Sequence, residues 1–416
     1  MKIITYILIC IIGLGVIFRL AKLDGTDLSA DEGIQFWVAK GNRAYSMHFL
    51  PRGKIEDVLK ANIRDNLDPP LFSVLLHYWS RIDNSIAWLR LLPCLFGIAV
   101  LPLIYLIARV VNFNRLWSLV ITAFCSSCFV WIHYSRDLRV YSFLIFCSTL
   151  TLYFILRLIK NNASKTIDHI GLAFVISLGL FSHYGFWILL PFLFVITIII
   201  IMLNKKQSLA KKVRNILIFL IPTLITVSYI IFQQLIYQWD IGTSLPYISI
   251  FGRLEAGSNF LQSSKYFFSL LAQTISWQLF AVPGIYPAMP DFDYEHNMPF
   301  LVSLLSLGLI FVYFFILIRL IREKRHLQAV PLAVFIFTMI TCIILYFAGL
   351  YPIGPVRQSL VFSPFLIISF FICIKYISKS LTSHAKVISK RSNDFLSILL
   401  IAILIVLNLH YSYQEL

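Results

Sequence analysis

Long apolar runs, separated by short polar segments, dominate the chain. A helix needs about 20 apolar residues to cross the hydrocarbon core of a bilayer, and eleven runs reach or approach that length. These candidate spans cover residues 3–21, 86–108, 116–134, 138–158, 168–184, 185–203, 215–236, 299–318, 328–349, 355–374 and 395–412. Two weaker stretches, 69–80 and 262–282, are interpreted as half-embedded or surface-lying helices. The pattern predicts an all-α polytopic membrane protein with about 11–13 transmembrane helices.

Two polar segments, 22–68 and 237–298, are too long to be simple connections between spans. In the first of them, apolar residues recur at near-helical spacing over residues 31–47 and 54–64. That spacing predicts amphipathic helices lying on the membrane surface. We find no separate soluble domain, so residues 1–416 are predicted to form one membrane-embedded domain with two long outer segments.

Composition supports the membrane assignment, and the distribution of charge adds an orientation. The chain is 59% hydrophobic and only 13% charged, whereas soluble domains carry about 25% charged residues. The net charge of +16 could suggest a nucleic-acid partner, but 20 of the 35 basic residues fall in alternate short loops that hold only three acids. This bias follows the positive-inside rule. It predicts a cytoplasmic N-terminus, an outer 22–68 segment and no nucleic-acid partner.

The cysteines and the first apolar run add two further expectations. All seven cysteines fall in or beside apolar segments, so no structural disulfide is expected. Cys125 and Cys128 have the spacing of a redox or metal pair, but their apolar surroundings favour a packing role. No small-residue cleavage site precedes Lys22, so the first run is predicted to remain as an uncleaved span.

Five polar clusters fall at the predicted outer ends of the spans, at residues 31–32, 65–70, 133–141, 183–184 and 357. Charge beside lipid is costly and often marks a functional site. A carboxylate can act as a general base toward a hydroxyl or amine, and arginines bind phosphate by paired hydrogen bonds. Because all five clusters share one predicted face, they fit sugar transfer from a lipid-phosphate carrier.

Each cluster also has a purely structural interpretation. Asp31 and Glu32 suit the first turn of a helix that follows Ser29. Asp65 and Asp68 suit a turn before a proline-initiated helix. Arginines and aromatic residues near 133–141 suit an interfacial belt. The residues alone leave both interpretations open.

The order of the motifs resembles the GT-C glycosyltransferases of the family 39 type, a group that includes protein O-mannosyltransferases and lipid A aminoarabinose transferases. The resemblance rests on Asp31-Glu32 after the first span, Asp65-Asn66-Leu67-Asp68-Pro69-Pro70 before an apolar helix, Leu89-Arg90-Leu91-Leu92-Pro93, and Tyr134-Ser135-Arg136-Asp137-Leu138-Arg139-Val140-Tyr141-Ser142. It covers roughly residues 1–200 by motif and the remainder by topology.

The resemblance implies the GT-C fold and an inverting hexosyl or pentosyl transferase that uses a polyprenyl-phosphate-linked sugar. The acceptor would be a lipid, a glycan or a protein at the outer face, and membrane lipids would surround the enzyme. The catalytic residues implied are Asp31 and its neighbour Glu32. Residues implied to bind the donor phosphate are Arg139, Arg136 and Arg357. Residues implied to shape the site or bind donor or acceptor are Asp65, Asp68, His183, Tyr184 and Tyr141.

One departure concerns position 68, because many relatives have His-Pro-Pro where this chain has Asp68-Pro69-Pro70. The role of Asp68 is therefore open, and so is a divalent cation held by Glu32 and Asp68. No other metal site is assigned.

Two other functions remain open from the sequence. A transporter or flippase of a lipid-linked saccharide would use the same charges to guide a headgroup, and a non-catalytic envelope assembly protein would not need them. The candidate spans are nearly free of ionisable residues at mid-depth, which favours an enzyme. A compact chain without a large lumenal domain favours a bacterial inner membrane.

Overall fold

The structure is a computed structural model. It describes residues 2–42, 52–66, 68–237, 271–272, 274–279, 300–347, 357–384, 401–403, 405–406 and 408–410. Over these residues every regular element is a helix, as the hydrophobic pattern predicts. Most of the predicted outer segment 237–298 lies outside the described residues.

The chain begins with α1 (Lys2–Leu20), and three short helices follow it: α2 (Ala30–Ala39), α3 (Ile55–Asp65) and α4 (Leu71–Trp79). Longer apolar helices come next, namely α5 (Ile86–Val110), α6 (Arg115–Ser127), α7 (Phe129–Arg136), α8 (Tyr141–Lys160), α9 (Thr166–Leu180), α10 (Leu190–Met202) and α11 (Leu209–Ile230). The later helices are α15 (Phe300–Arg322), α16 (His326–Phe347) and α17 (Ser363–His384). Short 3-10 helices, η1 (Tyr184–Ile188) and η3 (Arg357–Phe362), and a π-helix, η2 (Ile231–Leu235), complete the set.

Among the described residues, six helices are long and apolar enough to cross a membrane. The pair α6 and α7 makes a seventh if it counts as one span, because it is bent by 50° at its break. Three shorter apolar helices cover Thr166–Leu180, Leu190–Met202 and Ile401–His410. Over the described residues, each candidate span overlaps a helix, with 116–134 divided between α6 and α7, and several helices are shorter than the apolar run that predicted them.

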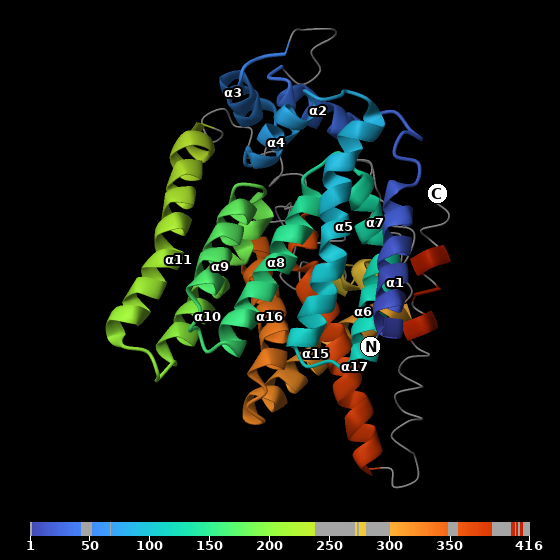
Figure 1. The fold of residues 1–416 in the computed structure, drawn as a ribbon, viewed down its shortest axis with the longest axis vertical. Coiled ribbons are helices and arrows are strands. Elements are labelled where there is room, and N and C mark those ends of the chain that lie inside the picture. The colour runs from blue at the N-terminus through green and yellow to red at the C-terminus, as the bar shows by residue number, and fades with distance from the viewer. Residues whose placement is uncertain are drawn as a thin grey trace, which may run out of the picture. The chain divides into compact units, whose positions relative to one another are not determined.

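The chain divides into two compact units. We call residues Arg19–Val100 and His133–Gly252 the site unit, and the remainder the second unit. In the site unit, α8, α9 and α11 pack side by side, while α2, α3 and α4 pack on one another. In Figure 1 these three short helices lie across one end of α5, α8 and α9. We call α2, α3 and α4 the platform.

Close helix packing in the site unit depends on glycine. A Cβ on Gly97 of α5 would come 2.6 Å from Cβ of Ser135, and a Cβ on Gly179 of α9 would come 2.6 Å from the ring of Phe186. Neither distance can be accommodated without a shift. Because dispersion and close contact drive helix association in lipid, these glycines set how closely α5 and α9 approach their neighbours.

In the second unit, α15, α16 and α17 pack together. The indole Nε1 of Trp131 donates a hydrogen bond to Ser363 Oγ at 2.8 Å, and the Tyr313 and Phe335 rings lie edge to face. Arg357 is the first residue of η3 in this unit. None of the seven cysteines forms a disulfide, as the sequence predicts. Cys125 and Cys128 are both buried, and their packing role stays a prediction.

One boundary in the platform differs from the sequence prediction. The near-helical spacing over 31–47 predicted a longer helix, but α2 ends at Ala39. Gly41 follows with φ of +76°, a left-handed conformation that favours glycine and stops a helix. The apolar spacing continued past this residue and concealed the break.

Candidate functional site

The N-terminus of α2 places the two adjacent acids. Ser29 is the N-cap, and it forms a capping box with Glu32 in which each side chain accepts a hydrogen bond from the other residue's backbone N–H. Asp31 and Glu32 therefore occupy the first turn, where carboxylates are favourable. The two acids therefore do start a helix, as the structural interpretation of the motif expects. The environments of their side chains differ, and this difference indicates different roles.

Glu32 is a buried structural acid. Its side chain is 4% exposed and forms a bidentate ion pair with Arg90 of α5, with Nε to Oε1 and Nη2 to Oε2 both at 2.8 Å. Oε1 also accepts the backbone N–H of Leu138 at 2.8 Å, and Oε2 accepts that of Ser29 at 2.9 Å. Burial would raise the pKa of Glu32, but the hydrogen bonds from Arg90, Leu138 and Ser29 outweigh it and hold the pKa below its usual value.

Arg139 lies in the four-residue connection between α7 and α8, which Glu32 holds through Leu138. Its Nη1 donates to the backbone carbonyl of Asp31 at 3.0 Å, and its Nη2 lies 3.9 Å from Oδ2 of Asp68. The guanidinium carbon lies 5.9 Å from the ring centroid of Tyr141. The buried Arg139 thus joins the first turn of α2 to the segment that precedes α4.

His183 approaches Asp68 from the other side. It is the N-cap of η1, and its Nδ1 accepts the backbone N–H of Gly185 at 2.8 Å. In the neutral ring the proton is therefore on Nε2, which lies 3.3 Å from Oδ1 of Asp68. Asp68 consequently has Arg139 on one oxygen and His183 on the other.

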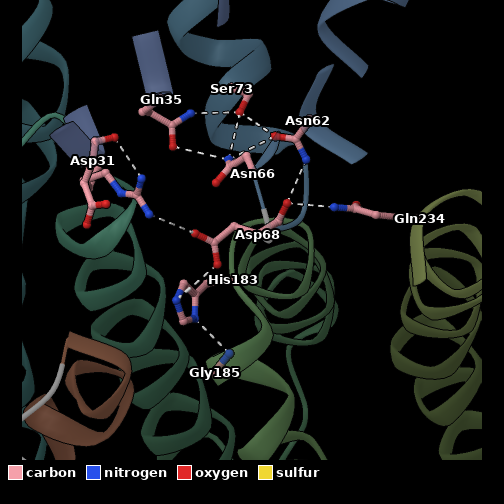
Figure 2. Close-up of polar contacts among 10 residues, drawn as sticks. Asp31, Gln35, Asn62, Asn66, Asp68, Ser73, His183, Gly185 and Gln234 are labelled. Carbon is pink, nitrogen blue, oxygen red and sulfur yellow. Dashed lines mark hydrogen bonds and ion pairs between the residues drawn. The ribbon is translucent and has the colours of Figure 1, made fainter. Parts of the chain in front are cut away.

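A polar network fixes the backbone of Asp68 (Figure 2). The Asp68 carbonyl accepts hydrogen bonds from Asn62 Nδ2 and from Gln234 Nε2, each at 2.7 Å. Behind it, buried side chains of the platform are joined to one another, with Ser73 Oγ donating to Asn62 and accepting from Gln35. Asn66 closes the network. Three platform helices and η2 thus position a single aspartate.

Aromatic rings line the His183 side of this arrangement. The Tyr141 ring lies 5.6 Å from that of His183, edge on, and the Tyr134 ring lies 5.3 Å from that of Tyr141. Burial raises the pKa of Tyr184, and the negative charge of Asp68 raises it further. Tyr184 therefore stays a neutral phenol at physiological pH, able to donate one hydrogen bond.

The structure brings Asp31, Asp68, Arg139 and His183 together, with Tyr141 and Tyr184 beside them. Asp65 ends α3 and pairs with Arg64 at 3.3 Å, Arg136 is half-buried at the end of α7, and Arg357 belongs to the second unit. Their proposed roles stay predictions.

Two residues that position the site were not assigned to it from sequence. Arg90 was visible only as part of a motif, although an arginine within an apolar run was itself a signal. Gln234 lies at the end of another apolar run, and nothing in the sequence connects it with Asp68. Its location in a π-helix, an element often found at functional sites, becomes apparent only in the structure.

The proposed pairing of Glu32 and Asp68 around a divalent cation does not fit this geometry. Glu32 already accepts four hydrogen bonds, which saturate a carboxylate. Over the part of the chain that the structure describes, no three His, Cys, Asp or Glu side chains gather in a metal-binding arrangement.

Comparison with known proteins agrees with the resemblance seen in the sequence. Residues 73–238 match the family model for dolichyl-phosphate-mannose-protein mannosyltransferases. No curated protein matches the chain significantly in sequence. Two solved structures of the oligosaccharyltransferase of Archaeoglobus fulgidus share the fold. The apo form has a TM-score of 0.52 at 12% identity, and AglB with an inhibitory peptide and a dolichol-phosphate has 0.50 at 11%.

These alignments cover 98% and 99% of this chain but only 56% and 55% of the archaeal chains. The chain therefore spans about half the length of the solved structures that it matches. It is an integral membrane protein with the GT-C fold, helical in all its regular elements over the described residues. The family match and the shared fold together support its assignment to the GT-C superfamily of glycosyltransferases.

Proposed function

We propose that this chain is a glycosyltransferase that moves a sugar from a polyprenyl-phosphate carrier to an acceptor on the outer face of the membrane. The observation that carries the proposal is the convergence of Asp31, Asp68, Arg139 and His183, which are distant in sequence. The buried Arg139 guanidinium meets the Asp31 backbone carbonyl and the Asp68 carboxylate, and Asp68 in turn meets His183. Two comparisons support a lipid-phosphate donor. Residues 73–238 match the model of the dolichyl-phosphate-mannose-protein mannosyltransferases, and the similar AglB structure holds a dolichol-phosphate.

In the proposed reaction, the half-buried Asp31 carboxylate accepts the proton of the acceptor hydroxyl or amine. The acceptor atom then attacks the anomeric carbon, and the bond between that carbon and the phosphate oxygen breaks. The electron pair leaves with the polyprenyl phosphate, and attack from the opposite side inverts the sugar. Arg139 stabilises the charge that develops on the leaving phosphate.

The other residues of the site hold these two groups in place. Glu32 binds Arg90 and the backbone of Leu138, and so positions both the first turn of α2 and the connection that carries Arg139. The Asp68 carboxylate lies between the Arg139 guanidinium and His183. We assign the Tyr184 phenol to hydrogen bonding with a sugar or acceptor hydroxyl. We therefore assign Glu32 a positioning role beside the base Asp31.

The test is transfer of label from a panel of radiolabelled polyprenyl-phosphate sugars in membranes that contain the chain. Asp31→Asn should lower kcat by about 10²–10⁴, the usual contribution of a general base. Asp24→Asn, which neutralises an exposed acid of the same segment, is the matched control and should behave as the wild type. Arg139→Lys keeps the charge but loses the paired hydrogen bonds of a guanidinium to the leaving phosphate, so it should lower kcat by about ten- to a hundredfold.

Thermal unfolding of each variant separates loss of chemistry from loss of fold. Equal transfer by wild type and Asp31→Asn would remove Asp31 from the mechanism. No transfer from any donor, with labelled lipid still moving between leaflets, would favour the transporter instead.

A further inference from the structure

A second cluster of charge lies at the opposite end of α4 from Asp68. Lys40 follows the last residue of α2, Arg52 precedes α3, and Arg81 follows α4. Arg52 and Arg81 contact His77 near the C-terminus of α4, and Lys40 follows Ala39, whose carbonyl oxygen contacts the His77 ring. Since a helix rises about 1.5 Å per residue, the nine residues of α4 separate this cluster from the candidate active site by about 13 Å.

His77 organises the cluster without neutralising it. Its ring is fully buried, and Nδ1 lies 2.8 Å from the carbonyl oxygen of Ala39. An oxygen acceptor requires the proton on Nδ1, so Nε2 carries a lone pair and accepts a hydrogen bond from Arg81 Nη2 at 2.9 Å. The histidine is thus a neutral link between α2 and Arg81.

Arg52 is bound entirely by neutral acceptors. Nη1 donates to the His77 carbonyl and to Ser80 Oγ, both at 2.8 Å, and Nη2 donates to the Ser80 carbonyl at 2.6 Å and to Asn84 Oδ1 at 3.1 Å. Capping of the α4 C-terminus explains Arg52 by itself. It does not explain why Lys40 and Arg81 gather at the same place.

Over the described residues, none of the three cations has a carboxylate oxygen within the 4.0 Å of an ion pair. Of the nearby acids, Asp57 accepts the backbone N–H of Lys54, and Asp83 is bound by Ser85. Burial lowers the pKa of Lys40, and the charge of Arg52 lowers it further. Burial and the charge of Arg81 likewise lower the pKa of Arg52. Within the part of the chain that the structure describes, the cluster is thus a concentration of positive charge without a carboxylate counter-ion.

The surroundings of the cluster suit a lipid surface. Lys40 Nζ lies 4.5 Å from the ring centroid of Phe36, and the Arg81 guanidinium lies 5.0 Å from that of Tyr78. Tyr78 is 52% exposed and Ile82 is 70% exposed. Cations set among exposed aromatic and aliphatic side chains are typical of surfaces that contact lipid headgroups.

We propose that Lys40 and Arg81, with the charge of Arg52 beside them, bind the phosphate of an anionic phospholipid, and so hold the platform against the membrane surface. Lys40 and Arg81 supply the donors to the phosphate, and Arg52 adds positive charge beside them because its Nη groups already donate to His77, Ser80 and Asn84. Tyr78 and Ile82 enter the interface beside the headgroup. The site is distinct from the candidate active site and does not depend on the proposed reaction.

The test uses the purified full chain in detergent and follows the thermal unfolding midpoint during titration with dihexanoyl phosphatidylglycerol. Dihexanoyl phosphatidylcholine and inorganic phosphate are the comparison ligands. The wild type should show a saturable rise in the midpoint with phosphatidylglycerol at far lower concentration than with either comparison ligand. Since each cation near a lipid surface contributes about fivefold in affinity, the double variant Lys40→Gln, Arg81→Gln should need about 25-fold more lipid.

Lys60→Gln removes an exposed cation of α3 on the same platform and should leave the titration unchanged. If the double variant does not fold, Arg81→Gln alone, at an exposed position, should still weaken binding by about fivefold. Identical titrations for wild type and the Arg81 variant would overturn the proposal. An equal response to inorganic phosphate would also overturn it, because it would identify a site for soluble anions.

Discussion

At the residue scale, two neighbouring acids of the same helical turn have different environments. Glu32 is saturated by an ion pair and two backbone hydrogen bonds, whereas Asp31 is half-buried and contributes its backbone carbonyl to Arg139. A buried ion pair contributes little net stability compared with apolar side chains. Removing one partner nevertheless lowers the free energy of unfolding strongly, because the other charge is left buried without a partner.

Glu32→Gln should therefore destabilise the fold by about 3–5 kcal/mol, since it leaves Arg90 charged and buried. Denaturant unfolding of the purified protein measures the change. Glu56→Gln, at an exposed position in the first turn of α3, is the matched control and should change stability little. A loss of activity in Glu32→Gln with wild-type stability would contradict a positioning role and favour direct participation.

At the element scale, the platform depends on where α2 ends. Gly41 has φ of +76°, and a Cβ there would come 2.9 Å from Cβ of Asp57. The turn after α2 therefore requires glycine for its backbone and for its close approach to α3. Gly33, within α2, has no atom near the place its Cβ would occupy.

Two alanine substitutions test this difference. Gly41→Ala should destabilise the protein by about 1–2 kcal/mol through the left-handed backbone alone, with the contact to Asp57 adding to it. Gly33→Ala should stabilise it by about 0.5–1 kcal/mol, because alanine loses less conformational freedom in a helix. Denaturant unfolding of both variants measures the change in the free energy of unfolding. A change of the same sign in both variants would contradict the assigned end of α2.

His77 makes the platform sensitive to acid. Burial lowers its pKa, the hydrogen bond to Ala39 opposes this, and the charges of Arg81 and Arg52 lower it further. The unfolded chain therefore binds more protons than the folded one once the pH falls below about 6.5, the usual histidine pKa. Stability should be greatest above that pH and should fall as the pH decreases.

Thermal unfolding midpoints between pH 8 and pH 5 measure this loss. His77→Gln retains a donor for Ala39 and an acceptor for Arg81 but does not titrate, so its midpoint should vary less with pH over this window. His326→Gln changes an exposed histidine in the first turn of α16 and should keep the wild-type dependence. A slope unchanged in His77→Gln would assign the acid sensitivity to another group.

At the scale of the whole molecule, the proposed orientation places the platform outside and the basic loops inside. The Lys/Arg bias of the short loops carries this proposal, together with the platform's position across one end of the helices of the site unit (Figure 1). The platform borders both the candidate active site and the proposed lipid site, so its side of the membrane decides which acceptors can reach the candidate active site.

Labelling with a membrane-impermeant maleimide tests this orientation. Lys60→Cys, on exposed α3, should react in intact cells, whereas Lys206→Cys, in the exposed turn between α10 and α11, should react only after the membrane is opened. The wild-type chain gives the background from its own cysteines. The opposite pattern would invert the proposed topology and place the candidate site in the cytoplasm.

The sequence by itself determined the class of the molecule and named the candidate site residues Asp31, Asp68, Arg139 and His183, but not Arg90 or Gln234, which position them. Helix length, apolar content and periodicity are local properties, so the helices of the platform and the apolar spans could be predicted from short windows of the chain. The convergence of Asp31, Arg139 and His183 was predictable because polar residues beside lipid are few and the motif order was recognisable.

Only the tertiary structure decided how those residues are paired. Glu32 meets Arg90, 58 residues away, and the backbone of Leu138, 106 residues away, while Asp68 meets Gln234 across 166 residues. Such pairings depend on how helices pack, and helix packing depends on close contacts such as those at Gly97 and Gly179, to which a hydrophobic pattern is insensitive. The pattern could therefore name two adjacent acids, but the fold alone distinguished the one that is buried against an arginine from the one that is half-buried.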